Sequence, residues 1–228
     1  MQAHPSTAPR SDGSHRPGER APWAKLAPGA RRGIGVERVR RAVETRRRVL
    51  GGAARVSDEG SSPTGARAAV LVPIFEEDGE ARVVLTRRAA DLRTHPGEVS
   101  FPGGRLDAGE TPEQGALREA AEEIALDPAS VELVGRLTAL STFSSAAAVT
   151  PVVGVLSSRP KLLANPSEVE RVFDVALADL AVAEVFREET WVVLGASSPV
   201  WFFELDEDTI CGATARVLVE LLRLVLEV

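Results

Sequence analysis

The chain has 228 residues, of which 44% are hydrophobic and 26% charged, as in a globular domain with appendages. Its formal net charge of -6 excludes nucleic-acid binding by overall charge. The sequence has no apolar signal segment and no run of roughly 18 apolar residues, and its single cysteine, Cys211, excludes an internal disulfide, so we expect a cytoplasmic protein.

The first 65 residues divide into two segments. Residues 1–32 are rich in Pro, Ser, Gly, Ala and Arg without an apolar period, which predicts a disordered, mildly basic tail. A polyanion-binding arm is the alternative. Residues 33–65 are expected to hold a short helix over Val36–Leu50 and then a linker. The apolar positions of this helix are Val36, Val39, Ala42, Val43 and Val49.

Residues 66–228 are predicted to form the compact domain. Asp78–Gly79 marks a hairpin turn, Glu168–Leu180 fits a strand or a short helix, and Cys211–Leu226 has the apolar spacing of a closing helix. Strands are predicted at Ala68–Phe75, Arg82–Thr86, Val131–Leu140, Thr150–Leu156, Trp191–Leu194 and Val200–Leu205. Strands and helices mix without regular alternation, which favours an α+β fold or an α/β/α sandwich.

A further helix is predicted from Thr111 to about Ile124. Thr111 is a favoured N-cap, Pro112 suits the first helical position, and Gln114 completes a capping box. The apolar positions of the helix are Ala116, Leu117, Ala120, Ala121 and Ile124. Their spacing of three and four residues predicts that one side of this helix packs on a core.

Three acids of this helix point to a metal. Glu119, Glu122 and Glu123 stand at i, i+3 and i+4 and therefore share one side of the helix. Carboxylates at such short separations repel one another, and a cluster of negatively charged oxygen ligands is what Mg²⁺ or Mn²⁺ requires. Arg118 lies one residue away, where it can orient a carboxylate, with Glu110 as a partner.

The loop Phe101–Gly104 precedes the acids and contains two glycines beside a proline. Glycine lets backbone groups approach a ligand closely, so this loop and the acidic helix together suit a phosphate-and-metal site. There the metal would bridge diphosphate oxygens while water attacks phosphorus. A solvated acidic helix face is the alternative for the local cluster alone.

The full spacing resembles the Nudix box. It reads Gly104, five residues, Glu110, seven residues, Arg118-Glu119, two residues, Glu122-Glu123 and then Leu126. The resemblance implies a Nudix-type α/β/α sandwich with a mixed sheet, and metal-dependent cleavage of a nucleoside diphosphate linked to another moiety. It implies that Glu119, Glu122 and Glu123 are the catalytic acids and, with Gly104, form the metal site, while Glu110 and Arg118 form a structural ion pair.

The general base is either one of the box glutamates or an acid outside the box, such as Glu168 or Glu170. Two box positions depart from the family pattern. Ala125 replaces a glycine, which costs roughly 1 kcal/mol if the backbone needs positive φ there. Ala120 replaces a bulky aliphatic residue and shrinks a packing contact.

A second motif resembles the coenzyme A diphosphatase subgroup of that family. The stretch from Leu85-Thr86 to Phe101-Pro102-Gly103-Gly104 matches its signature except at Ala89, where the subgroup has serine. Thr150–Gly154 and Gly212–Ala215 are also similar to that subgroup. The residues expected to contact substrate are Arg88, Arg93, His95, Gly97, Phe101 and Gly103. The resemblance implies hydrolysis of coenzyme A or a derivative to 4′-phosphopantetheine and adenosine 3′,5′-bisphosphate.

Two other functions stay open at this point. One is a Nudix hydrolase for ADP-ribose, NADH or another dinucleotide, and the other is a non-catalytic Nudix binding domain. The expected partner is a small diphosphate molecule with Mg²⁺ or Mn²⁺ as cofactor, and a homodimer is left open. We expect neither nucleic acid nor membrane as a partner.

Overall fold

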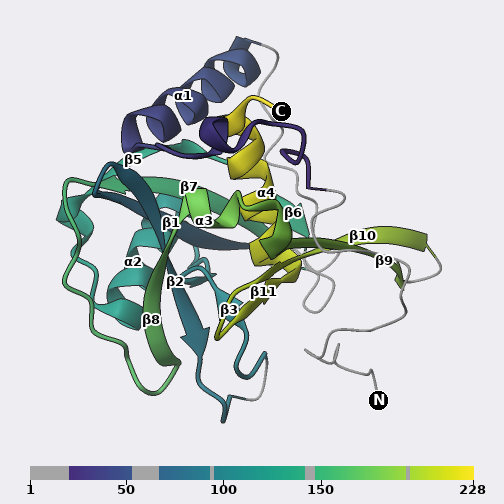
Figure 1. Ribbon diagram of the computed structural model, residues 1–228. Coiled ribbons are helices and arrows are strands. Elements are labelled where there is room, and N and C mark those ends of the chain that lie inside the picture. The colour runs from purple at the N-terminus through teal and green to yellow at the C-terminus, as the bar shows by residue number, and fades with distance from the viewer. Residues whose placement is uncertain (1–20, 53–66, 93–94, 142–146, 194–195) are drawn as a thin grey trace.

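The computed structural model describes residues 21–52, 67–92, 95–141, 147–193 and 196–228 (Figure 1). The α-helices are α1 (Val36–Gly52), α2 (Pro112–Ile124), α3 (Leu177–Leu180) and α4 (Gly212–Leu226), and the 3-10 turns are η1 (Pro28–Arg31), η2 (Pro128–Ser130) and η3 (Ala183–Val185). The strands are β1 (Arg67–Glu77), β2 (Glu80–Arg88), β3 (Val99–Ser100), β4 (Gly103–Arg105), β5 (Val131–Arg136), β6 (Leu140–Ser141), β7 (Ala148–Leu156), β8 (Val169–Ala176), β9 (Phe186–Val193), β10 (Ala196–Glu204) and β11 (Thr209–Cys211).

A mixed sheet lies at the centre of the described chain. Its middle strand β1 runs parallel to β7 and antiparallel to β2. The turn between β1 and β2 is the predicted Asp78–Gly79 hairpin, in which both residues have positive φ. The short β4 pairs with Ala68–Val70 on the edge of β1 that β2 also uses farther along. Strand β8 continues the sheet beyond β2, and β3 pairs with Thr86 and Arg87 on the other edge of β2. Strands β5 and β6 pair with β7.

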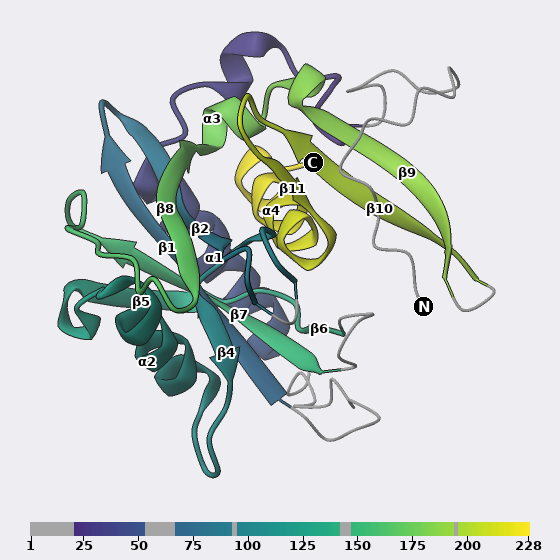
Figure 2. The same ribbon diagram turned by 90° about the horizontal axis from the view of Figure 1, so that it is seen from below.

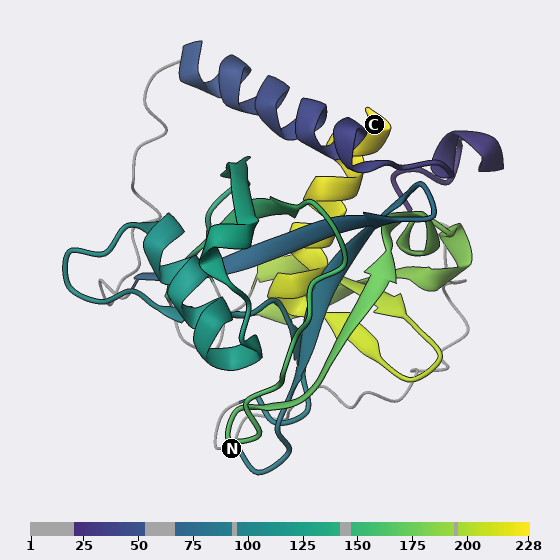
Figure 3. The same ribbon diagram turned by 90° about the vertical axis from the view of Figure 1, so that its left-hand side faces the viewer.

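Helices cover both faces of this sheet, as Figure 3 shows. Successive residues of a strand point to opposite faces. Val72 and Ile74 of β1 therefore join the cluster beneath α1 and α4, while Leu71 and Phe75 join the cluster beneath α2. The expected α/β/α sandwich with a mixed sheet is confirmed.

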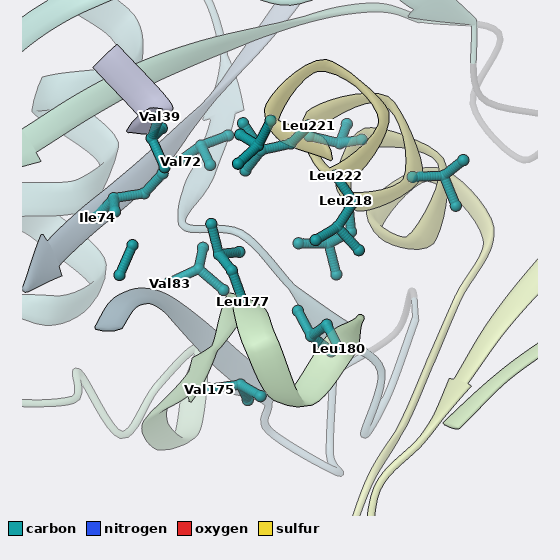
Figure 4. Close-up of a cluster of buried hydrophobic side chains, with 14 of the residues drawn as sticks. Val39, Val72, Ile74, Val83, Val175, Leu177, Leu180, Leu218, Leu221 and Leu222 are labelled. Atoms are coloured by element: carbon teal, nitrogen blue, oxygen red, sulfur yellow. The ribbon is translucent and has the colours of Figure 1, made fainter. Parts of the chain in front are cut away.

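The larger of the two core clusters is shown in Figure 4. Val39 of α1 and Leu221 and Leu222 of α4 lie over Val72 and Ile74 of the sheet. All five side chains are 0% exposed. Helix α4 is therefore part of the main core, and the predicted closing helix is confirmed.

The N-terminal boundary of the packed unit differs from the prediction. Residues 1–20 of the predicted tail lie outside the described residues. In the rest of the predicted tail, Ala21 and Trp23 are buried in the larger core cluster and Leu26 packs against it, so the disordered tail predicted over residues 1–32 does not extend over this part. Trp23 is fully buried against Phe186 and Phe203, with ring centroids 5.3 and 6.2 Å away. A single buried indole supplies this burial, and it offers no apolar period for a sequence pattern to detect.

Helix α1 is held at its start by acids of the hairpin. The carboxylate of Glu80 accepts hydrogen bonds from the backbone of Gly33 and Ile34, and Glu76 accepts one from Val36, at 2.8 to 3.1 Å. The orphan amides of a helix start are commonly satisfied in this way. The predicted helix is confirmed, and its linker lies within residues 53–66, outside the described part.

The C-terminal strands form a second, smaller sheet in the order β11-β10-β9. Figure 2 shows β9 and β10 as a long ribbon on the side of α4 away from β1 and β7. Two predictions change in detail. The single strand expected over Val131–Leu140 breaks into β5 and β6, with a register shift beginning at Leu133. The ambiguous stretch Glu168–Leu180 holds both structures, β8 and then α3. No helix of the described residues is long and apolar enough to cross a membrane.

Candidate active site

Helix α2 begins as its sequence predicts. The Thr111 hydroxyl accepts a hydrogen bond from the Gln114 amide at 3.3 Å, and the Gln114 side chain accepts one from the Thr111 amide at 2.9 Å. Pro112 occupies the first turn. Ala116, Ala120 and Ile124 are 0% exposed in the cluster beneath α2. The helix is therefore fixed on the sheet by this face, which leaves its acidic side toward loops.

The three acids of α2 differ in burial. The side chain of Glu123 is 5% exposed, that of Glu119 16% and that of Glu122 58%. Burial raises the pKa of Glu119, and it raises the pKa of Glu123 to about 7. The charges of Glu119 and Glu168 add to the rise at Glu123, against the Gly103 amide and Arg88. One helix thus carries an enclosed carboxyl at Glu123, a partly buried one at Glu119 and a solvated one at Glu122.

The two glycines of the preceding loop meet these acids. The Gly103 amide donates to Glu123 Oε2 at 3.1 Å. A Cβ placed on Gly104 would lie 2.4 Å from the carboxyl carbon of Glu119, and a Cβ on Gly103 would lie 2.4 Å from the carbonyl oxygen of Ala69. The backbone of β1 therefore requires glycine at position 103, whereas glycine at position 104 leaves space for a site carboxylate.

Arg118 is bound by carboxylates on several sides. Its Nε and Nη2 donate to Glu110 at 3.0 and 3.1 Å, and its Nη1 donates to Glu119 at 3.1 Å and Glu122 at 3.0 Å. The hydrogen bond from Arg118 lowers the pKa of Glu110. The Glu110–Arg118 pair expected from the sequence is thus present in the structure, and it ties the loop before α2 to the helix.

The residues fit a hard divalent cation in their chemistry. Their donors are all carboxylate oxygens, one carboxyl is enclosed, and the absence of a Cβ at Gly104 lets the Glu119 carboxylate lie directly against the loop. Among the described residues no three acidic, histidine or cysteine side chains converge tightly enough to ligate an ion, and Arg118 instead contacts Glu119 and Glu122. A bound metal would therefore take these two carboxylates over from the guanidinium.

The residues expected to contact substrate lie in different environments, some beside the acids and some in the core. Arg88 points at the acids: its Nη1 lies 4.0 Å from Glu123 Oε1, and its buried Nε has no hydrogen-bond partner among the described residues. Phe101, in contrast, is 3% exposed in the core cluster beneath α1 and α4, so the expectation that its ring lines the site is wrong. An aromatic residue beside a glycine loop can line a site or pack in the core, and its burial in the structure shows that Phe101 packs in the core.

The loop residues His95 and Gly97 shape the turn between β2 and β3. Both have positive φ, 56° and 69°, and His95 Nδ1 lies 2.7 Å from Glu98 Oε2. The hydroxyl of Thr86 holds the return strand through the Ser100 carbonyl at 3.1 Å. Thr86, His95 and Gly97 of the upstream motif therefore determine the conformation of this loop. Arg93 lies outside the described residues.

Two acids outside the helix were candidates for the general base. Glu168 lies near the box, since its charge raises the pKa of both Glu119 and Glu123. Glu170 instead pairs with Arg87 Nε at 3.5 Å. This arrangement favours Glu168 over Glu170 as a member of the site. The sequence did not single out Asn165, three residues earlier, although its Asn-Pro pair is a turn signal.

Comparison with known proteins agrees with this geometry. The model of the NUDIX domain matches residues 65–193, more than half of the chain. Nudix hydrolase 15, mitochondrial, from Arabidopsis thaliana is 41% identical over 163 residues, which cover 67% of this chain and 56% of the relative. The Nudix hydrolase NudL of Photorhabdus laumondii is 35% identical over 161 residues, covering 70% and 85%.

Among solved structures, a Nudix hydrolase from M. smegmatis, RenU, is similar with a TM-score of 0.44 and 24% identity, covering 50% of this chain and 73% of that one. The chain spans about half the length of the Arabidopsis and Caenorhabditis elegans relatives that it matches.

Proposed function

Because the chain belongs to the Nudix family, we propose that it hydrolyses the diphosphate bond of coenzyme A or a derivative, giving 4′-phosphopantetheine and adenosine 3′,5′-bisphosphate. The observation that carries this proposal is the enclosed carboxyl of Glu123 against the Gly103–Gly104 loop, with Glu119 and Glu122 on the same helix. These acids would hold Mg²⁺ or Mn²⁺, which supplies charge neutralisation for the diphosphate oxygens and an acidified water.

The chain's own residues supply orientation and proton transfer. Arg88 binds a substrate phosphate oxygen through its guanidinium, in line with its position beside Glu123 and with an Nε that has no hydrogen-bond partner among the described residues. Glu168 or a box glutamate accepts the proton of the attacking water. The Glu110–Arg118 pair keeps the loop before α2 and the helix in register.

The choice of coenzyme A rests on the motif between Leu85 and Gly104. Its one departure, Ala89, is 6% exposed and donates its amide to the Glu168 carbonyl at 2.9 Å. A serine hydroxyl at this position would lie in the interior, so its loss is no argument against coenzyme A. ADP-ribose, NADH and other dinucleotides are the alternative substrates within the same reaction class.

A product assay on a panel of diphosphate compounds tests the substrate. Coenzyme A, acyl and oxidised coenzyme A, ADP-ribose and NADH are each incubated with the full chain and Mg²⁺ or Mn²⁺, and products are separated by chromatography. We expect kcat/KM to be highest for a coenzyme A compound and turnover to vanish with chelator. Higher kcat/KM on ADP-ribose or NADH would overturn the substrate but not the reaction class.

The variant Glu122→Gln tests whether the domain is catalytic. We expect it to lower kcat by about 100-fold or more, because a charged ligand is lost, while the fold is kept. Exposed Glu184→Gln, outside the site, is the matched control and should behave as wild type. Unchanged turnover in Glu122→Gln would instead favour the non-catalytic binding domain.

We further propose a small-molecule partner and a cytoplasmic location, supported by the single cysteine. The first relative described carries "mitochondrial" in its name, so fractionation of cells is the direct test of location. A fluorescent DNA duplex should show no salt-sensitive binding, and size-exclusion chromatography decides whether a homodimer forms.

A further inference from the structure

The C-terminal end of α2 is capped by a distant loop. The last carbonyls of a helix lack partners within the helix. Here the carbonyls of Ala120 and Ala121 accept from the amides of Ala125 and Leu126. The next three carbonyls, those of Glu122, Glu123 and Ile124, all accept from residues of the connection between β7 and β8.

Asn165 makes two of these three contacts. Its amide donates to the Glu123 carbonyl at 2.8 Å, and its side-chain Nδ2 donates to the Glu122 carbonyl at 3.4 Å. Leu163 makes the third, from its amide to the Ile124 carbonyl at 3.0 Å. The carbonyls that receive the Asn165 bonds belong to the two acids at the end of the metal face.

The same asparagine closes the turn that leads to Glu168. Asn165 Oδ1 accepts from the Ser167 amide at 3.2 Å and lies 2.7 Å from the Ser167 hydroxyl, and the Asn165 carbonyl accepts from Glu168 and Val169 at 3.0 and 2.8 Å. Pro166 restricts the turn further. One residue therefore bonds both to the helix of the box and to the turn that carries the outer acid.

The connection is also anchored before it reaches Asn165. Arg159 pairs with Glu77 at 2.7 Å and Asp174 at 2.9 Å and lies 5.0 Å over the Phe75 ring. Leu162 packs against the cluster beneath α2. Because the connection is held on the sheet, the position of the turn depends mainly on the hydrogen bonds that Asn165 makes.

Resting on the function proposed above, we propose that Asn165 is a positioning residue that fixes Glu168 in register with Glu119 and Glu123 for metal and substrate binding. No other described residue joins the carbonyl end of α2 to the Glu168 turn through its side chain. Alanine at this position keeps the backbone bonds, so helix α2 stays, while the turn that carries Glu168 loses its side-chain bonds to Ser167 and to the Glu122 carbonyl.

The test compares four variants in the full chain: Asn165→Ala, Asn165→Asp, Glu168→Gln and the double variant Asn165→Ala/Glu168→Gln. Ser158→Ala, an exposed change in the same connection, is the matched control. The readouts are kcat and KM on coenzyme A, and Mn²⁺ affinity by calorimetry without substrate. Thermal unfolding verifies that each variant is folded.

We expect Asn165→Ala to weaken Mn²⁺ binding or lower kcat by about 10–100-fold, the usual effect of losing an outer-shell partner. Asn165→Asp keeps the oxygen that accepts from Ser167 but loses the donor to the Glu122 carbonyl, so it should restore only part of the loss. In the Glu168→Gln background, Asn165→Ala should have no further effect, because both changes act on the same carboxylate.

Two results would overturn the proposal: wild-type values in Asn165→Ala, or the same loss with and without Glu168. If Asn165→Ala fails to fold, Pro166→Gly loosens the same turn without removing a donor and is judged by the same comparison. If the wild type cleaves no diphosphate at all, the proposed function fails. The Mn²⁺ affinities then still decide the role of Asn165, and equal values for wild type and variant overturn it.

Discussion

Neighbouring glycines in the site loop are required for different reasons, and substitution separates them. Gly104→Ala places a methyl 2.4 Å from the carboxyl of Glu119, a flexible side chain that can move away. We expect a folded protein with metal-dependent activity lower by about 10–100-fold. Gly103→Ala meets the Ala69 carbonyl at 2.4 Å, and backbone has nowhere to move. It should lower the free energy of unfolding by about 1–3 kcal/mol or more.

Urea unfolding and Mn²⁺-dependent turnover of the two alanine variants check this contrast. Equal loss of stability in both would show that the loop, and not the Glu119 carboxylate, sets the requirement at Gly104.

The buried carboxyl of Glu123 makes the metal-free protein sensitive to pH. Its pKa is raised by burial to about 7, above its ordinary value of 4.5, so the folded state binds a proton more tightly than the unfolded chain. Stability is therefore highest below the ordinary pKa and falls as the pH rises toward 7. Glu123→Gln removes this dependence and, without metal, should be more stable than wild type by on the order of 2 kcal/mol at about pH 8.

The difference between Glu123→Gln and wild type should disappear below the ordinary pKa of 4.5, at about pH 3.5, where the carboxyl is protonated in both states. Thermal unfolding in chelator at the two pH values measures it. A difference that does not change with pH would contradict the assignment of the effect to this ionisation.

At the scale of the element, helix α2 ends on a strained residue. Ala125 has φ 53°, a left-handed conformation that costs an L-residue roughly 1–2 kcal/mol. Ala125→Gly should therefore raise the free energy of unfolding by about 1 kcal/mol with unchanged activity. The same substitution inside the helix, Ala121→Gly, should lower it by about 1 kcal/mol. Denaturant titration of both variants checks the opposite signs.

The sequence predicted the bounds and capping of α2 well because each signal is local. The capping box at Thr111 and Gln114, the apolar stripe and the spacing of the acids all lie within one short segment. Asn165 could not be found in this way, because its partners lie 42 and 43 residues earlier and are backbone carbonyls, which carry no sequence signature. Phe101 was misplaced because an apolar residue next to a site fits the core equally well.

At the scale of the whole molecule, the N-terminal segment belongs to the folded unit. Trp23 joins residues 21–32 to the second sheet through Phe186 and Phe203. Trp23→Ala should cost about 3–5 kcal/mol of the free energy of unfolding, as large-to-small changes in a core do. Lys25→Ala, two residues away and exposed, is the control and should change little. Urea unfolding followed by circular dichroism measures both, and a small loss in Trp23→Ala would mean that the segment is only loosely attached.

Other long-range features of the fold were also beyond the sequence. The short strand β4 shares an edge of β1 with β2, and this pairing helps to place the glycine loop beside the acids of α2. Pairing between strands is decided by the whole sheet, so a three-residue strand rich in glycine gives no period of its own.

Arg118 has a consequence for how the protein behaves before any metal arrives. Its guanidinium holds the carboxylates of Glu110, Glu119 and Glu122 together, so it acts as a resident counter-ion for the site. On the proposed metal site, binding of a divalent ion would therefore replace the guanidinium charge at these carboxylates. Such an exchange gives up part of the metal's binding energy, yet it lets the helix fold and persist while the divalent ion is scarce.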